Sequence, residues 1–157
     1  MAWSWTRLQE NSQDARVERQ VHEYGCGAAC VVMLLRDRGI ASDQLVVCAG
    51  LHLPSTAQEL ARRLNEFSGS RYSWIGGHLD LDGQLGRPHV QALGQTGSWA
   101  ALLVPARLRE GHWVVVDGAP IDTTISIRDP AGASYAIPEA EFYSLMRYTV
   151  AVFERGR

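Results

Sequence analysis

The sequence contains no lysine, and all of its 15 basic residues are arginine. A codon bias towards arginine would explain this, and so would a protein that works inside a host cell and avoids ubiquitin attachment; both explanations stay open. An excess of positive charge is also missing, because 17 acidic residues give a formal net charge of -2. Without a basic field to hold a phosphate backbone, we expect no nucleic-acid partner.

Cysteines and long apolar runs are scarce as well. Three cysteines, Cys26, Cys30 and Cys48, are too few and too odd in number for a disulfide framework, so we expect free thiols. No apolar run approaches the ~18–20 residues that a membrane span needs, and residues 1–14 lack the pattern of a signal peptide. We expect a soluble protein, either cytoplasmic or secreted into a host or target cell without a classical signal peptide.

The 157 residues suit one domain, and 46% of them are hydrophobic, as is typical of a globular chain. We expect an N-terminal arm over residues 1–16 and a single domain over residues 17–157. Apolar spacing and helix-end residues predict three helices first: residues 26–38, a short helix capped by Ser42, and residues 57–67 with a Thr56/Glu59 capping box. Two further helices are expected, over residues 88–95 and after Pro138.

Short β-branched and aromatic runs between glycines and prolines predict strands in the second half of the chain. The expected strands are RYSWI, WAALLV, HWVVV, TISIRD, SYAI and YTVAVF. The fold class is therefore α+β, with an N-terminal helical part packed on a mostly antiparallel C-terminal sheet and a cleft where the two meet.

The first candidate for chemistry is the thiol of Cys26. It lies in the first turn of the expected helix, where backbone N–H groups stabilise a thiolate, the form that attacks a carbonyl carbon. Gly25 before it lets the chain turn, and Gly27 after it lets a substrate approach. Free cysteine is also a common core residue, and that alternative fits Cys30 and Cys48 better.

A catalytic thiol needs an oriented base, and His112 with Asp129 fits that need. His112 opens the strand HWVVV, and Asp129 closes the strand TISIRD. If the two strands form a hairpin, the match of their apolar faces predicts the cross-strand pairs Val114–Ile127, Val116–Ile125 and His112–Asp129. The same register predicts a cation–π contact between Trp113 and Arg128. A plain turn at Asp129 and a polar strand end at His112 stay open as the alternative.

Further residues are expected around these three. The side-chain amide of Gln20, six residues before Cys26, could join the Cys26 backbone N–H in binding a developing oxyanion. The residues expected to border the substrate are Gly25, Gly27, Gly111 and Trp113. A zinc site at His22, Cys26 and Cys30 would need one unbroken helix across two glycines, so we expect neither a metal nor another cofactor.

Together, these segments resemble papain-like cysteine peptidases, in particular the double-glycine leader peptidase domains of bacteriocin exporters. The resemblance covers most of residues 20–153 and depends on Gln20, CGAACVVMLLRDRGI, STAQELARRL, HWVVVDG, ISIRDPAG and EFYSLMRYTVAVF. It implies a catalytic Cys26, a general base His112, an orienting Asp129 and an oxyanion-binding Gln20. Gly25 departs from the family, which usually has an acidic residue before the nucleophile.

The resemblance implies a cysteine peptidase that cleaves a peptide bond in a leader-like or host-protein substrate. The membrane and ATPase parts of an exporter do not occur in this sequence, and papain-like effectors and toxins share the same order of residues. Two alternatives stay open: a deamidase or acyl-transferring toxin with the same triad, and a catalytically silent module that binds peptides.

Overall fold

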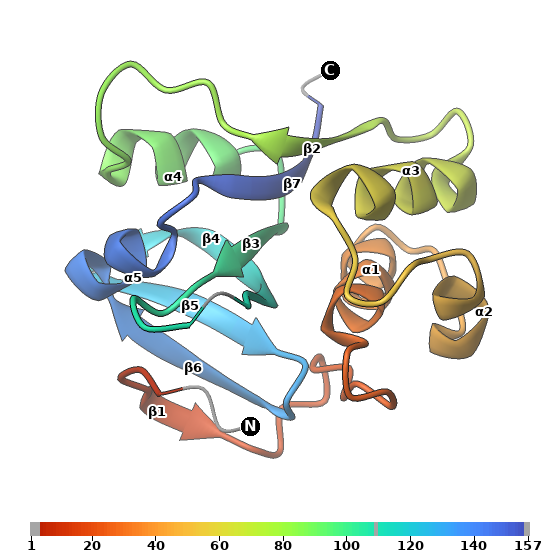
Figure 1. The fold of residues 1–157 in the computed structure, drawn as a ribbon, viewed down its shortest axis with the longest axis horizontal. Helices are drawn as coiled ribbons and strands as arrows, with labels where there is room; N and C mark the ends of the chain where they lie inside the picture. Colours follow the sequence, from red (N-terminus) through yellow and green to blue (C-terminus); the bar gives the residue numbers. More distant parts are fainter. Residues whose placement is uncertain (1–3, 109, 156–157) are drawn as a thin grey trace.

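The computed structural model describes residues 4–108 and 110–155. Its centre is a seven-stranded sheet with the strand order β1-β6-β5-β4-β3-β7-β2 (Figure 1). Every neighbouring pair of strands is antiparallel. The strands are β1 (Leu8–Asn11), β2 (Trp74–His78), β3 (Trp99–Leu103), β4 (His112–Ile121), β5 (Thr124–Asp129), β6 (Ala133–Pro138) and β7 (Val150–Glu154).

Helices cover both faces of the sheet and create two cores. The helices are α1 (Cys26–Asp37), α2 (Gln44–Ala49), α3 (Ala57–Ser68), α4 (Arg87–Gly94) and α5 (Glu139–Leu145). Helices α1, α2 and α3 gather on one side (Figure 1), and their core includes Trp113 and Val115 of β4. The core formed with α4 and α5 includes Val114 and Val116, the alternate residues of the same strand. The α+β prediction is confirmed.

Most of the predicted elements are present, with small differences at their ends. The Thr56/Glu59 capping box begins α3 as predicted. The side chain that caps α2 is that of Asp43, not Ser42, and it accepts a hydrogen bond from the backbone N–H of Leu45 at 2.8 Å. Strand β1 was not predicted; its four residues are all exposed, and the strand pairs with β6. A strand is recognised in a sequence by apolar residues that alternate with polar ones because one face is buried, and β1 buries neither face.

The predicted register of the β4–β5 hairpin is wrong by two residues. Val116 lies opposite Ile127, not Ile125. A tight turn pairs Ile121 with Thr124, and an irregularity between Asp117 and Ile121 then sets the register of the remaining ladder. A shift of two residues leaves every side chain on the same face of the sheet, so the apolar match could not distinguish the two registers.

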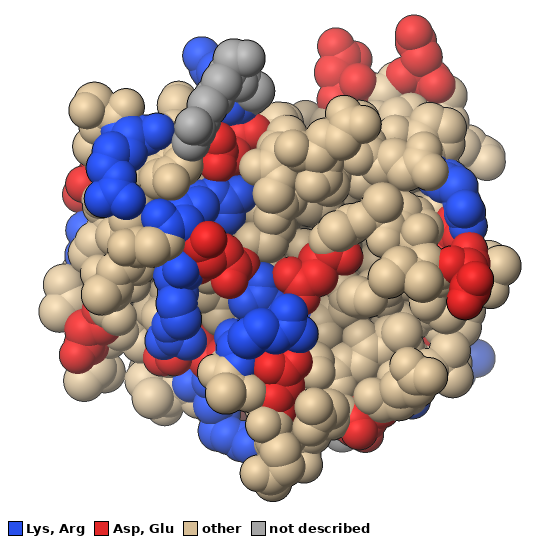
Figure 2. Space-filling model, turned by 180° about the vertical axis from the view of Figure 1, so that it is seen from behind, with Lys and Arg blue, Asp and Glu red and all other residues tan. Residues whose placement is uncertain are grey.

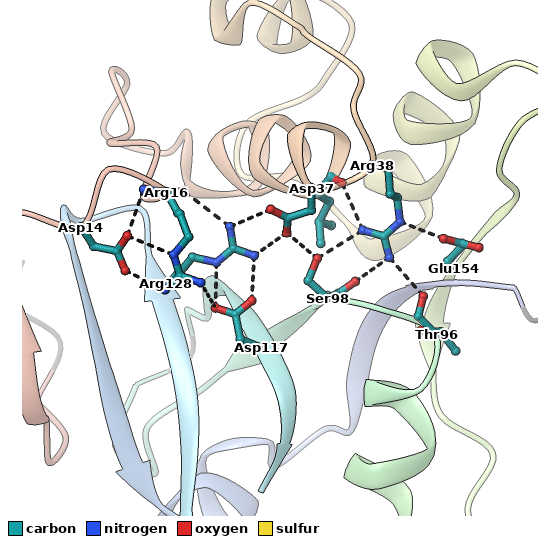
Figure 3. A network of polar contacts seen from close by, with 10 residues as sticks. Asp14, Arg16, Asp37, Arg38, Thr96, Ser98, Asp117, Arg128 and Glu154 are labelled. Atoms are coloured by element: carbon teal, nitrogen blue, oxygen red, sulfur yellow. Dashed lines mark hydrogen bonds and ion pairs between the residues drawn. The ribbon is translucent and has the colours of Figure 1, made fainter. Parts of the chain in front are cut away.

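The predicted contact between Trp113 and Arg128 is also wrong. The Arg128 side chain, 2% exposed, instead pairs with the carboxylates of Asp37, at the end of α1, and Asp117, on β4 (Figure 3). This network joins the helical part of the molecule to the sheet. Elsewhere, Figure 2 shows basic and acidic side chains next to one another on the face seen from behind, in keeping with the ion pairs between described residues.

Among the helices of the described residues, none has the length and apolar character required to cross a membrane.

Candidate active site

Cys26 is the first residue of α1, and its thiol lies at the meeting point of the helices and the sheet. The turn before the helix closes with a hydrogen bond from the Gly25 N–H to the His22 carbonyl at 2.9 Å. The backbone N–H of Trp113, on β4, donates to the Cys26 Sγ at 3.5 Å. The side chain is 8% exposed, whereas Cys30, one turn further along the helix, is 0% exposed and belongs to the core.

His112 and Asp129 form a buried pair beside this thiol. The two side chains come from the first residue of β4 and the last residue of β5, and the His112 Nε2 lies 2.6 Å from the Asp129 Oδ1. The observed register makes them diagonal and not direct neighbours, but they still share one face of the hairpin. His112 also contacts the Cys26 side chain. The structure thus brings Cys26, His112 and Asp129 together.

The charge states of the pair follow from its surroundings. Burial lowers the pKa of His112, but the hydrogen bond to Asp129 and the contact with Cys26 outweigh burial and raise that pKa to about 9. Burial raises the pKa of Asp129, and the hydrogen bonds from His112, Tyr135 and Ala131 bring it below its usual range. Asp129 is therefore ionised at neutral pH and can only accept, so the His112 Nε2 carries a proton. The other ring nitrogen, Nδ1, is left for the thiol.

A cleft of about 840 Å³ opens onto these residues. Cys26 and His112 line it together with residues from the sheet and from the start of α3, including Gly111, Trp113, Ser55, Thr56 and His78. The Trp113 indole N–H donates to the Ser55 carbonyl at 3.1 Å, which ties the two walls together. The cleft is where the sequence placed it, between the helices and the sheet.

Gln20 lines the same cleft, but its amide is occupied within its own loop. The Nε2 donates to the carbonyls of His22 and Glu23, both at 3.0 Å. The Gln20 backbone N–H donates to the Pro130 carbonyl at 2.8 Å, next to Asp129. To donate to an oxyanion, the Gln20 amide would have to give up one of these two hydrogen bonds. The role of Gln20 in binding the oxyanion stays a prediction.

Of the four residues expected to border the substrate, Gly111 and Trp113 line the cleft, while Gly25 and Gly27 are not among the described residues that do so. Gly25 caps α1 and closes the preceding turn. A Cβ on Gly27 would lie 2.9 Å from the Leu60 Cδ2. Gly27 therefore allows α1 to pack closely against α3, which is a different reason for a glycine than access for a substrate.

Three residues that support the site were not foreseen from the sequence. Tyr135 on β6 donates its hydroxyl hydrogen to the Asp129 Oδ2 at 2.6 Å, and the Trp5 indole donates to the Tyr135 hydroxyl at 2.8 Å. Gln44, 5% exposed, accepts from the Val21 N–H at 2.9 Å and donates to the Arg19 carbonyl at 3.0 Å, which fixes the segment that carries Gln20. Trp5 lies in the expected arm, where no pattern marks it. Gln44 begins a short helix whose next two residues, Leu45 and Val46, are exposed, so no pattern marked its burial either.

No group of three or more His, Cys, Asp or Glu side chains within residues 4–108 and 110–155 could hold a metal ion.

Comparison with solved structures identifies the class of fold. The chain is similar to the peptidase domain of Streptococcus ComA, a bi-functional ABC transporter of a quorum-sensing pathway, with a TM-score of 0.67 and 15% identity over 90% of this chain and 98% of that chain. It is equally similar to a double-glycine motif protease from an AMS/PCAT transporter solved with its leader peptide, with a TM-score of 0.67 and 18% identity over 96% and 94% of the two chains. The fold is that of papain-like peptidase domains, as the sequence resemblance implied.

A curated relative by sequence is Cysteine protease effector 1 of Escherichia coli O1:K1:H7. It is 37% identical over 140 residues, which are 88% of this chain and 26% of the relative. The chain thus spans about a quarter of the length of that protein. A scan of protein-family models found no match.

Proposed function

We propose that the protein is a cysteine peptidase in which Cys26 is the nucleophile, His112 the general base and Asp129 the residue that orients His112. The observation that carries this proposal is the buried His112–Asp129 hydrogen bond of 2.6 Å beside the Cys26 thiol, at the floor of a cleft. The fold of two peptidase domains and a relative named as a cysteine protease support it.

In the first half of the reaction, the thiol proton is already held on the His112 Nδ1, as the raised pKa of His112 favours, and the Cys26 thiolate attacks the carbonyl carbon of a bound peptide. The C–N bond then breaks, the amine leaves with the proton from the imidazolium, and an acyl group stays on the sulfur as a thioester. The ionised Asp129 stabilises the imidazolium throughout and keeps the ring oriented. In the second half, water attacks the thioester with His112 as base, which releases the acid and restores the thiol.

The negative charge on the attacked oxygen needs hydrogen-bond donors. The first backbone N–H groups of an α-helix have no partner within the helix, and Cys26 is the first residue of α1. We assign its N–H as one donor and the Gln20 amide, which lines the cleft, as the second. One lost donor of this kind typically costs about 10²–10³ in rate.

The substrate in this proposal is a peptide segment with small residues at the cleaved bond. Cys26 is 8% exposed and His112 is 3% exposed, so a bulky side chain has little room beside them. One of the structural neighbours is named a double-glycine motif protease and was solved with a leader peptide. A free leader-like peptide and a flexible segment of a host protein both meet this description.

The test uses two synthetic peptides that differ only at two consecutive central residues, glycine-glycine in one and valine-valine in the other. We expect mass spectrometry to show two fragments of the glycine peptide with the wild-type protein and with a Cys48→Ala control, and intact peptide with Cys26→Ala. Cleavage by Cys26→Ala would overturn the proposal. A mass gain of about 1 Da without fragments would replace it with a deamidase, since loss of an amide nitrogen leaves an acid.

A further inference from the structure

The buried carboxylate of Asp129 has a third partner that a Cys-His-Asp arrangement does not require. Asp129 is 1% exposed. Its Oδ1 accepts from the His112 Nε2 at 2.6 Å and from the Ala131 N–H at 2.8 Å, and its Oδ2 accepts from the Tyr135 hydroxyl at 2.6 Å. A carboxylate buried this deeply needs donors on both oxygens. For Oδ2, Tyr135 supplies such a donor.

The direction of the Tyr135 hydroxyl is fixed by Trp5. An indole N–H is a donor only, so the Tyr135 oxygen must accept the 2.8 Å hydrogen bond from the Trp5 Nε1. The hydroxyl hydrogen then has to point to Asp129, and each hydrogen bond in such a series polarises the next. Donation thus converges on Asp129: Trp5 donates to Tyr135, Tyr135 and His112 both donate to Asp129, and His112 in turn contacts the Cys26 thiol.

Strand β1 and its flanking residues hold Trp5 in place. Leu8 and Asn11 pair with β6, the strand that carries Tyr135. The Thr6 N–H donates to the Glu141 Oε2 at 2.7 Å, and the Arg7 guanidinium lies 5.1 Å from the centre of the Tyr135 ring. The Trp5 ring also lies 6.1 Å from the His112 ring, centre to centre. The N-terminal segment therefore contributes directly to the surroundings of the site.

We propose that Tyr135 and Trp5 are positioning residues for the reaction, which act on Cys26 through Asp129 and His112. This inference rests on the proposed function for its meaning in catalysis. Neither Tyr135 nor Trp5 is among the residues that line the cleft, so in this proposal both act without contact to the substrate. Loss of the hydrogen bonds from Trp5 and Tyr135 should therefore slow the chemical step and leave substrate binding intact.

The test is a double-mutant cycle with Tyr135→Phe and Trp5→Phe. Tyr135→Phe removes only the hydroxyl, and we expect kcat to fall about tenfold with KM within about twofold of the wild-type value, because a hydrogen bond to a buried charge is strong. Trp5→Phe removes the indole N–H, and we expect about a threefold loss. Trp5→Phe keeps an aromatic ring beside His112, so in the Tyr135→Phe background, where the hydrogen-bonded route is already lost, it should have little further effect on kcat.

A matched control is Tyr143→Phe, which removes a tyrosine hydroxyl that donates to the Glu139 carboxylate, also at 2.6 Å, on α5. We expect this variant to keep wild-type kcat. A simple structural role for Trp5 would give the same loss in both backgrounds, and that additivity would overturn the proposal. So would wild-type kcat in Tyr135→Phe.

A second readout does not depend on peptidase activity. The rate at which iodoacetamide alkylates Cys26 at neutral pH should fall in Tyr135→Phe and Trp5→Phe with the same non-additive pattern. The reason is that the orientation and charge of the His112 ring control the reactivity of the Cys26 thiol. If the wild-type protein cleaves no peptide, the proposed function fails, while these alkylation rates still decide the positioning roles. Thermal unfolding checks that each variant is folded, and Trp5→Phe, at a half-buried side chain, keeps the test valid if Tyr135→Phe is unfolded.

Discussion

The protonation of two buried side chains determines what Cys26 can do. Hydrogen bonds from His112, Tyr135 and Ala131 keep the pKa of Asp129 below its usual range, so this carboxyl is ionised. The Asp129 carboxylate and the Cys26 side chain raise the pKa of His112 to about 9, although burial alone would lower it. An imidazolium next to a thiol favours the thiolate. For the other two cysteines, burial is the largest effect, and it raises the pKa of the Cys30 and Cys48 thiols.

The thiols should therefore differ in reactivity. We expect iodoacetamide at pH 7 to alkylate Cys26 at least about tenfold faster than Cys48, and Cys30 to react only on unfolding, because the thiolate is the nucleophile. Peptide mapping after timed alkylation measures each rate. Equal rates for Cys26 and Cys48 in the folded protein would contradict an activated Cys26.

The raised pKa of His112 also makes the stability of the protein depend on pH. The pKa is about 9 in the folded chain against 6.5 as the ordinary value. A group with a raised folded pKa stabilises the fold fully below its unfolded pKa, and this contribution is lost as the pH rises through the folded pKa. We expect the free energy of unfolding to fall by about 2–3 kcal/mol between pH 6.5 and pH 9.

Urea unfolding across this pH range measures that loss, with His112→Gln as the comparison because glutamine does not titrate there. The variant should lack most of the pH dependence. The same fall in both proteins would mean that other groups cause it and that His112 is not held charged.

At the scale of elements, the approach of β2 to the start of α3 shapes one wall of the cleft. A Cβ on Gly76 would lie 2.2 Å from the carbonyl oxygen of Ala57, the first residue of α3. Backbone cannot give way as a side chain does, so glycine is required for this contact. Gly77 and His78, which follow on β2, and Ala57 line the cleft.

We expect Gly76→Ala to lower the free energy of unfolding by about 2–3 kcal/mol, because overpacking forces backbone shifts. Gly86→Ala is the control, since the nearest atom to its added Cβ lies 3.8 Å away and its φ of -154° suits alanine. Denaturant midpoints compare the two variants. Equal stability of Gly76→Ala and Gly86→Ala would show that β2 and α3 do not need this close approach.

Elements with strong local signals were predictable from the sequence. The capping box at Thr56 and the apolar periodicity after Cys26 define α3 and α1, and the β-branched runs define the strands of the sheet. Strand β1 was not predictable, because it depends on a partner 120 or more residues away and buries no face of its own. Pairing with β6, and not local sequence preference, determines the structure of β1.

The candidate site was predictable in its residues but not in its geometry. A cysteine in the first turn of an apolar helix, a histidine at a strand start and an aspartate at a strand end were visible in the sequence, and the three side chains meet in the structure. The register that joins His112 to Asp129 was not, because the irregularity after Asp117 has no sequence signal and a shift of two residues conserves the apolar match. Tyr135 and Trp5 depend on long-range contacts that periodicity does not encode.

At the scale of the whole molecule, the site exists only because the helical part stays docked on the sheet. Arg128 of β5, 2% exposed, donates to the Asp37 Oδ1 at 3.1 Å and to the Asp117 Oδ1 and Oδ2, both at 2.8 Å (Figure 3). Asp37 also accepts from the Ser98 hydroxyl at 2.5 Å. These contacts hold the last residue of α1, whose first residue is Cys26.

Removal of the buried Arg128 side chain should weaken the contact between the helical part and the sheet, and should disturb the site that they form together. We expect Arg128→Ala to lower the free energy of unfolding by about 3 kcal/mol, since it removes the buried guanidinium that pairs with Asp37 and leaves Asp117 only its longer contact with Arg16 at 3.7 Å, and to slow alkylation of Cys26 by disturbing its contact with His112. Arg62→Ala is the control, because the Arg62–Glu66 pair lies on the surface and such pairs contribute little. Urea unfolding that gives Arg128→Ala and Arg62→Ala the same stability would contradict this role.

The most direct test of the central claim, that Cys26 and the His112–Asp129 pair form a peptide-cleaving site, is digestion of an unbiased peptide library by the wild-type protein and by Cys26→Ala, with new peptide ends identified by mass spectrometry. The account predicts a defined set of new ends with small residues at the cut, present with the wild-type protein and missing with Cys26→Ala. The same new ends with both proteins, or none with either, would contradict it.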